Sequence, residues 1–145
     1  MYKGVVLLLV LAVAAGCYGG ELTPEDAKAA IVELGKTCAK NTGATEADIE
    51  ELKTKVPLES KGAKCMAACM YKSFGVIKEG KYNVDALVAA GKMLYDESTP
   101  QFEQIKKIAT DCSKDLADED ECELAAKAIA CESPKFKEAG IEIPL

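Results

Sequence analysis

Cysteines are the residues of this chain best suited to chemistry, and two of its seven stand close together in the stretch CMAACMYKSFG, residues 65–75. Cys65 and Cys69 could ligate a metal ion, act as a redox pair or form disulfides with other segments. Zinc sites usually combine close-spaced cysteines with His, and the chain contains no His. A redox pair requires a C-x-x-C motif, which is missing. Disulfides are therefore the favoured chemistry, and we expect neither a metal nor a cofactor.

Catalytic combinations of side chains find no support in the sequence. Without His, the chain cannot form a Ser–His or Cys–His pair. Its acidic clusters, at residues 46–51 and 118–121, coincide with expected helix starts, where carboxylates complement the helix dipole and solubilise the surface. We therefore expect a protein that is not an enzyme.

The amino-terminal residues indicate where the protein works. Lys3 precedes the apolar run GVVLLLVLAVAA at residues 4–15, and small residues follow, which is typical of a secretory signal peptide. The run is too short to cross a bilayer, which needs about 20 apolar residues. We expect a signal peptide at residues 1–19, with cleavage within 17–20, and one secreted, extracellular domain at residues 20–145.

Removal of the signal peptide leaves six cysteines and, because Lys3 is lost, changes the net charge from −6 to −7. An even number of cysteines in a small secreted chain indicates a disulfide framework. A domain with net negative charge is poorly suited to bind nucleic acid or an anionic membrane through general electrostatics. We therefore expect no nucleic-acid partner and no membrane insertion.

Short helices are expected to position the cysteines. Ala, Glu, Lys and Leu dominate after the signal peptide, and alternating β-branched runs are absent. Capping residues and Pro or Gly punctuation predict six helices, at about residues 24–41, 45–53, 62–74, 83–95, 99–114 and 118–132. Pro134 and Gly140 predict a non-helical tail. The fold class is therefore all-α.

Helical geometry restricts how the six cysteines can pair. Residues four apart on a helix have Cβ atoms about 5–6 Å apart, whereas a disulfide requires about 3.8 Å, so Cys65 and Cys69 cannot pair with each other. Cys122 and Cys131 lie about 13 Å apart along one helix axis and cannot pair either. These exclusions leave 10 of the 15 possible connectivities open.

Cross-links would allow short helices to surround a space that is not fully packed. Helices of this length are marginal alone in water, and each disulfide could add about 3–4 kcal/mol of stability. Flexible apolar side chains could line a ligand cavity or fill an ordinary core. These residues are Met66, Met70, Tyr71, Phe74, Leu87, Met93, Leu94, Ile105, Ile108 and Ile129.

The cysteine spacing resembles that of the six-cysteine insect odorant-binding protein family, which includes pheromone-binding and general odorant-binding proteins. The pattern is Cys38-x26-Cys65-x3-Cys69-x42-Cys112-x9-Cys122-x8-Cys131, in which the x3 and x8 intervals mark the family. The resemblance covers nearly all of the chain after the signal peptide. It implies six short helices stapled by three interlocked disulfides around an apolar cavity, with the pairs Cys38–Cys69, Cys65–Cys122 and Cys112–Cys131.

The resemblance also implies a carrier that binds small hydrophobic molecules, such as odorants or pheromones, in an internal pocket. It implies a small hydrophobic ligand and a membrane chemoreceptor as partners, and a monomer or weak homodimer. Tyr71 is the first candidate for a polar ligand contact, because some family members place a ligand-bonding side chain two residues after the third cysteine. The alternative is a disulfide-stapled interaction or defence protein without a ligand cavity.

The carboxyl-terminal sequence GIEIPL alternates apolar and acidic residues, and Pro144 prevents a helical end. Ile141 and Ile143 could extend over the pocket mouth and contact ligand, while a mobile terminus is the alternative. Because the chain has no His, acid-triggered release would have to involve carboxylates, whose ordinary pKa values lie near 3.3–4.3. We therefore expect nearly constant affinity between about pH 7.5 and 5.5.

Overall fold

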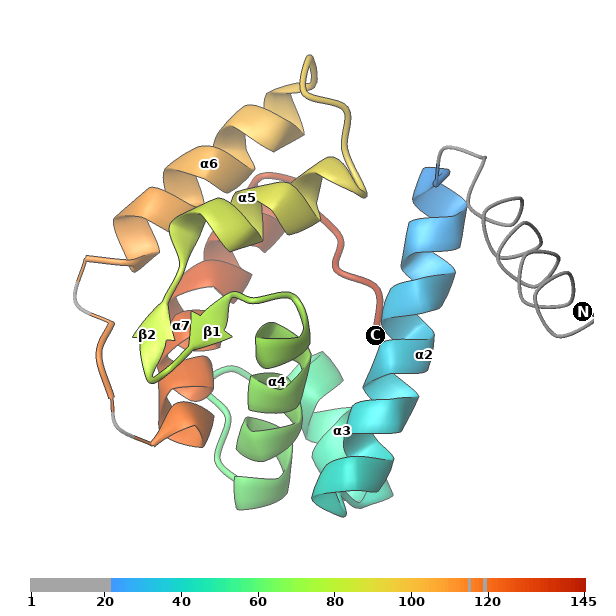
Figure 1. The fold of residues 1–145 in the computed structure, drawn as a ribbon, viewed down its shortest axis with the longest axis vertical. Coiled ribbons are helices and arrows are strands. Elements are labelled where there is room, and N and C mark those ends of the chain that lie inside the picture. The colour runs from blue at the N-terminus through green and yellow to red at the C-terminus, as the bar shows by residue number, and fades with distance from the viewer. Residues whose placement is uncertain (1–21, 115, 119) are drawn as a thin grey trace, which may run out of the picture.

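The computed structural model describes residues 22–114, 116–118 and 120–145, so the expected signal peptide lies outside the described residues. Within this part the all-α class is confirmed, with one small addition, a two-stranded antiparallel hairpin between α4 and α5 (Figure 1). The elements are α2 (Pro24–Thr42), α3 (Glu46–Thr54), α4 (Lys61–Ser73), β1 (Ile77–Lys78), β2 (Lys81–Tyr82), α5 (Val84–Lys92), α6 (Pro100–Cys112) and α7 (Glu121–Glu138). Across the described residues we find no helix with the length and apolar character that crossing a bilayer requires.

Helices α2 and α3 begin where their capping sequences predict. Thr23 and Thr45 each accept a hydrogen bond from the backbone of the third helical residue, and the side chains of Asp26 and Asp48 return one to the cap backbone. This reciprocal arrangement satisfies donors that the first turn of a helix leaves free. At the other end of α2, Gly43 adopts a left-handed φ of 69°, which glycine tolerates without steric cost.

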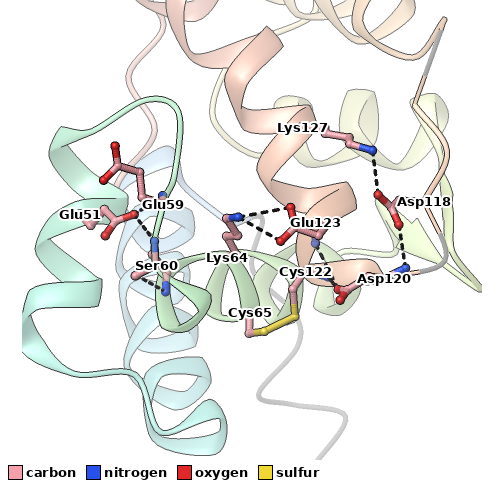
Figure 2. Close-up of polar contacts among 11 residues, drawn as sticks. Glu51, Glu59, Ser60, Lys64, Cys65, Asp118, Asp120, Cys122, Glu123 and Lys127 are labelled. Atoms are coloured by element: carbon pink, nitrogen blue, oxygen red, sulfur yellow. Dashed lines mark hydrogen bonds and ion pairs between the residues drawn. A yellow bond between two sulfur atoms is a disulfide. The ribbon is translucent and has the colours of Figure 1, made fainter.

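The turn between α3 and α4 is held by carboxylates from α3. Ser60 caps α4 and donates its hydroxyl to Asp48 at 2.7 Å. The Glu51 carboxylate accepts the backbone N–H groups of Glu59 and Ser60, as Figure 2 shows. Part of the acidic cluster at residues 46–51 therefore organises the chain locally, in addition to complementing a helix dipole.

The start of α7 differs from the prediction. Asp120, rather than Asp118, is the N-cap, and its carboxylate accepts N–H groups from the first turn (Figure 2). Asp118 instead accepts hydrogen bonds from Lys127 at 2.7 Å and from the backbone N–H of Asp120 at 3.0 Å. Both carboxylates satisfy a donor near the helix start, so the sequence cluster alone did not distinguish the two roles.

The end of α7 also differs, because the helix continues through Pro134 to Glu138. A proline inside a helix costs about 3 kcal/mol, through a missing hydrogen bond and a steric clash. Phe136 lies beyond the proline and is only 4% exposed. Burial of a phenylalanine side chain contributes about 1.5–3 kcal/mol, which offsets half or more of that cost. The predicted helix end at residue 132 was therefore wrong because tertiary packing overrides the local proline signal.

The hairpin β1–β2 was missed because its strands contain two residues each, too few for an alternating pattern. The turn residues Glu79 and Gly80 have φ values of 52° and 71°, the positive values that a tight two-residue hairpin favours. The hairpin returns the chain from α4 toward α7 and places the Tyr82 side chain beside Glu132.

Helix α4 has a central position and is joined to neighbours on two sides (Figure 1). The disulfides are Cys38–Cys69 between α2 and α4, Cys65–Cys122 between α4 and α7, and Cys112–Cys131 between α6 and α7. These are the pairs that the family resemblance implies. Figure 2 shows the ion pair Lys64–Glu123 near the second disulfide, so covalent and polar contacts join the same two helices.

Buried apolar side chains form two clusters. The larger one joins α2, α3, α4, β1 and α7, and the smaller one joins α6, the end of α7 and Ile141. Helix α5 approaches α6 closely at Gly91, where an added Cβ would lie 3.0 Å from Ile105 Cγ2. The buried interior is therefore divided between two groups of helices.

Candidate functional site

A cavity of about 750 Å³ lies between the two buried clusters, since residues of both line it. Each of the six helices in the described residues contributes to its wall. The lining includes Ile31 of α2, Leu52 of α3, Met70 of α4, Leu87 of α5, Ile105 of α6 and Ile129 of α7. Small-molecule sites commonly have volumes of about 300–1,000 Å³ and mainly apolar walls. The cavity therefore has the size and surface of a ligand site.

The structure brings together nine of the residues that the sequence suggested as ligand contacts. They are Met70, Tyr71, Phe74, Leu87, Leu94, Ile105, Ile129, Ile141 and Ile143. Met66, Met93 and Ile108 are not part of the wall. Met66 packs in the larger cluster and Ile108 in the smaller one, each 4% exposed. The lining residues of α4 recur every three or four positions, which explains why only one face of that helix meets the cavity.

The carboxyl-terminal tail forms part of the wall and runs toward α2 (Figure 1). Ile141 is buried, and its N–H donates to the carbonyl of Phe136 at 2.9 Å. Glu142 donates its N–H to the hydroxyl of Tyr95 at 3.0 Å, which ties the tail to the segment after α5. The tail is thus attached at two successive residues before it reaches its end.

Apolar side chains on the wall are also exposed to solvent, which marks the mouth of the cavity. Ile143 is 47% exposed, Leu145 36% and Val56 43%. Val56 follows α3, so the mouth lies between the end of α3 and the tail. Exposed apolar residues that rim a cavity are common at ligand-binding sites.

The carboxyl group of Glu132 was missed by the sequence reasoning. Glu132 is among the residues that line the cavity and is only 1% exposed. The Tyr71 hydroxyl donates to its Oε2 at 2.5 Å, and the Tyr82 hydroxyl donates to its Oε1. Glu132 is absent from all ion pairs found among the described residues. It is therefore a buried acid held by two phenols and no cation.

Burial raises the pKa of Glu132 to about 7, and the hydrogen bonds from Tyr71 and Tyr82 lower it only in part. Burial, together with the nearby carboxylate, raises the pKa of both tyrosines above the usual range, so they remain protonated donors. The expectation that carboxylates near the ligand titrate only at ordinary values is wrong for Glu132, because it lies in a low-dielectric wall.

Tyr71 lies in the cavity wall, and its hydroxyl donates to Glu132. Direct contact between this hydroxyl and a ligand stays a prediction. A sequence signal for Glu132 does exist: it lies three residues after Ile129 and four before Phe136, on the apolar stripe of α7. The sequence-based prediction ended this helix at residue 132, so it left Phe136 out and did not recognise the stripe.

Comparisons with known proteins agree with the fold and the cysteine pattern. The model of the PBP/GOBP family matches residues 21–134. The chain is 28% identical to general odorant-binding protein 19d of Drosophila melanogaster over 139 residues, which cover 95% of this chain and 93% of that protein. It is 26% identical to general odorant-binding protein 28a of the same organism over 118 residues, covering 81% of this chain and 82% of that protein.

A solved structure gives the same result at the level of the fold. Odorant-binding protein dmelOBP28a from Drosophila melanogaster aligns with a TM-score of 0.67 and 27% identity, covering 82% of this chain and 99% of that one. The family resemblance inferred from cysteine spacing is confirmed, and this chain belongs to the PBP/GOBP family.

Proposed function

We propose that this protein is an extracellular carrier that binds small hydrophobic molecules, such as odorants or pheromones, in its internal cavity. The main observation is the cavity of about 750 Å³, to which all six described helices contribute apolar side chains. Transfer of an apolar ligand from water into such a wall is favourable by about 25 cal/mol per Å² of buried surface. Relatives named odorant-binding proteins support this choice over a stapled protein without a cavity.

Secretion fits the same function. The three disulfides are of a kind that persists in oxidising compartments, and residues 1–19 have the pattern of a cleaved signal peptide. Amino-terminal sequencing of the secreted protein should give a start within residues 18–21. A mature protein that retains the apolar run at residues 4–15 would contradict this part of the proposal.

A carrier that delivers a ligand would need a downstream partner, for which a membrane chemoreceptor is our proposal. We further propose a monomer or weak homodimer, the state that the family resemblance implies. Sedimentation velocity over a range of concentrations tests this state. A stable dimer at nanomolar concentration would contradict it.

The binding test uses N-phenyl-1-naphthylamine, an apolar fluorescent probe, with two matched substitutions on α5. Ala90 lies in the cavity wall, whereas Ala89 is exposed and outside it. We expect the wild type to bind the probe, Ala90→Trp to weaken binding at least several-fold because the larger ring occupies cavity volume, and Ala89→Trp to bind normally. Absence of binding to the wild type, or equal losses in the two variants, would contradict an internal carrier site.

A further inference from the structure

Glu132 has hydrogen-bonding capacity that its protein partners do not use. A carboxylate offers about four lone-pair sites, and the described structure fills two of them, with the hydroxyls of Tyr71 and Tyr82. Both tyrosines are neutral donors, so they do not compensate a negative charge. A buried charge is costly unless it is paired. The cavity wall therefore contains an acidic group that a ligand of opposite charge would stabilise.

Aromatic rings surround the same cavity. Tyr71 of α4, Phe74 just after α4, Tyr95 after α5 and Phe136 of α7 all belong to the wall. The face of an aromatic ring attracts a cation, and the attraction increases when the cation is removed from water. A cavity whose lining includes a carboxyl group and aromatic residues is a suitable environment for an organic ammonium ion.

The other charged groups of the wall differ from Glu132 in exposure. Lys53, Lys137 and Glu142 contribute to the lining but are exposed, so water screens their charges. Lys53 and Lys137 would favour an anionic head group at the mouth, whereas Glu132 would favour a cationic one inside. Buried Glu132 has the stronger effect on which head-group charge the cavity prefers, because electrostatic interactions are larger in a low-dielectric interior.

We propose that the cavity binds hydrophobic amines, with the protonated nitrogen held by the Glu132 carboxylate and the aromatic wall, and the hydrocarbon part among the apolar residues. This inference rests on the proposed carrier function and specifies its ligand class. Tyr71 and Tyr82 act as positioning residues, since their hydroxyls orient the carboxyl group.

The amine preference should depend on pH through Glu132. A simple alkylamine, like the side chain of lysine, keeps its proton up to about pH 10. Glu132 titrates near 7, while the facing groups Tyr71 and Tyr82 stay protonated throughout the range. The preference is therefore expected at pH 8 and should decrease toward pH 5.5, as the carboxylate becomes neutral.

The test compares three probes with the same chain length: decylamine, decan-1-ol and decanoic acid. Each displaces N-phenyl-1-naphthylamine from the full-length secreted protein at pH 8. We expect decylamine to bind about tenfold or more tightly than decan-1-ol, the effect of one charge-assisted hydrogen bond, and decanoate to bind most weakly. Glu132→Gln should abolish the amine preference and retain decan-1-ol binding. Glu138→Gln makes the same change in net charge at an exposed position of α7 outside the cavity wall and should keep the preference.

The possible results separate this inference from the carrier function. Equal binding of decylamine and decan-1-ol to the wild type, a preference for decanoate, or equal effects of the two Gln substitutions would overturn the amine inference while leaving the carrier function intact. Failure of the wild type to bind any probe would overturn both. If Glu132→Gln does not fold, the pH series decides: loss of the amine preference between pH 8 and 5.5 in the wild type supports the inference, and a preference independent of pH overturns it.

Discussion

Glu132 has almost no contact with water, although an ionisable acid normally lies at the surface unless it is paired. Folding therefore favours its protonated form. A carboxyl group whose pKa rises on folding makes its full contribution to stability when the pH is below its pKa in the unfolded chain, here about 4.5. That contribution is lost as the pH increases through its pKa in the folded protein, about 7. At alkaline pH, the ionised Glu132 reduces the stability of the fold.

The first prediction concerns Glu132→Gln, which keeps the shape of the side chain but cannot ionise. The raised pKa corresponds to about 3 kcal/mol of stability lost above pH 7. We expect the variant to be more stable than the wild type by up to about 3 kcal/mol at pH 8.5, and to gain little or nothing at pH 4.5. Urea unfolding at both pH values measures this difference. An equal change at both values would mean that Glu132 does not titrate on folding.

The second prediction concerns Tyr82→Phe, which removes one hydrogen bond to Glu132 outside the cavity wall. Hydrogen bonds to a charged group contribute about 1.5–3 kcal/mol, so the pKa of Glu132 should increase by about one unit or more. Carbon-detected NMR of the side-chain carboxyl group follows the titration. Tyr95→Phe is the matched control, because Tyr95 lies in the wall and contacts Glu142 instead. A downward shift in Tyr82→Phe would contradict the described geometry.

The elements of the fold differ in how visible they are in the sequence. Helices α2, α3 and α6 begin where local sequence signals predict. Each has a capping threonine, followed by a proline at the first helical position, an aspartate three positions after the cap, or both. The hairpin β1–β2 has strands of only two residues, too short to show an alternating pattern. The last turns of α7 depend on the packing of Phe136 against α6, a contact that no local window of sequence contains.

The candidate site was predictable to a similar degree. Apolar spacing and the tail sequence predicted nine of the lining residues, but they did not exclude Met66, because the face of a helix that meets the cavity depends on the neighbouring elements. Glu132 became part of the site only through the hairpin, which supplies Tyr82, and through α4, which supplies Tyr71. The combination of three elements, each unremarkable alone, creates the buried acid.

The third prediction concerns the tail as an element that closes the mouth. Deletion of residues 142–145 removes Ile143 and Leu145 from the rim but retains Val56 and the buried Ile141. We expect several-fold faster release of N-phenyl-1-naphthylamine in stopped-flow experiments, with a melting temperature close to that of the wild type, because terminal residues contribute little to global stability. Unchanged release kinetics would show that the tail is not a barrier.

The molecule as a whole combines a divided interior with covalent links between helices. The cavity separates two buried clusters, so the apolar contacts across it are incomplete. Three disulfides join α2 to α4, α4 to α7, and α7 to α6. They stabilise the fold mainly by restricting the unfolded chain. Stability from such links does not require the cavity to be filled.

The fourth prediction tests whether the disulfide next to Glu132, rather than apolar packing, supplies stability where the cavity divides the interior. Residues Cys112 and Cys131 are separated by 19 positions, and a link of that span contributes about 3 kcal/mol in the chain-entropy model. We expect Cys112→Ala/Cys131→Ala to lose about that amount in urea unfolding at pH 5.5, where Glu132 is largely neutral. A loss well below about 1 kcal/mol would mean that packing, rather than the link, holds α6 against α7.

The internal position of the ligand is tested most directly by a crystal structure of the protein with 10-bromodecan-1-ol, whose bromine is located by anomalous scattering. We expect one bromine site per chain, inside the cavity and among residues such as Leu87, Ile105 and Ile129. Bromine found only on the outer surface, or an empty cavity at saturating ligand, would contradict the conclusion that this protein carries hydrophobic molecules in its interior.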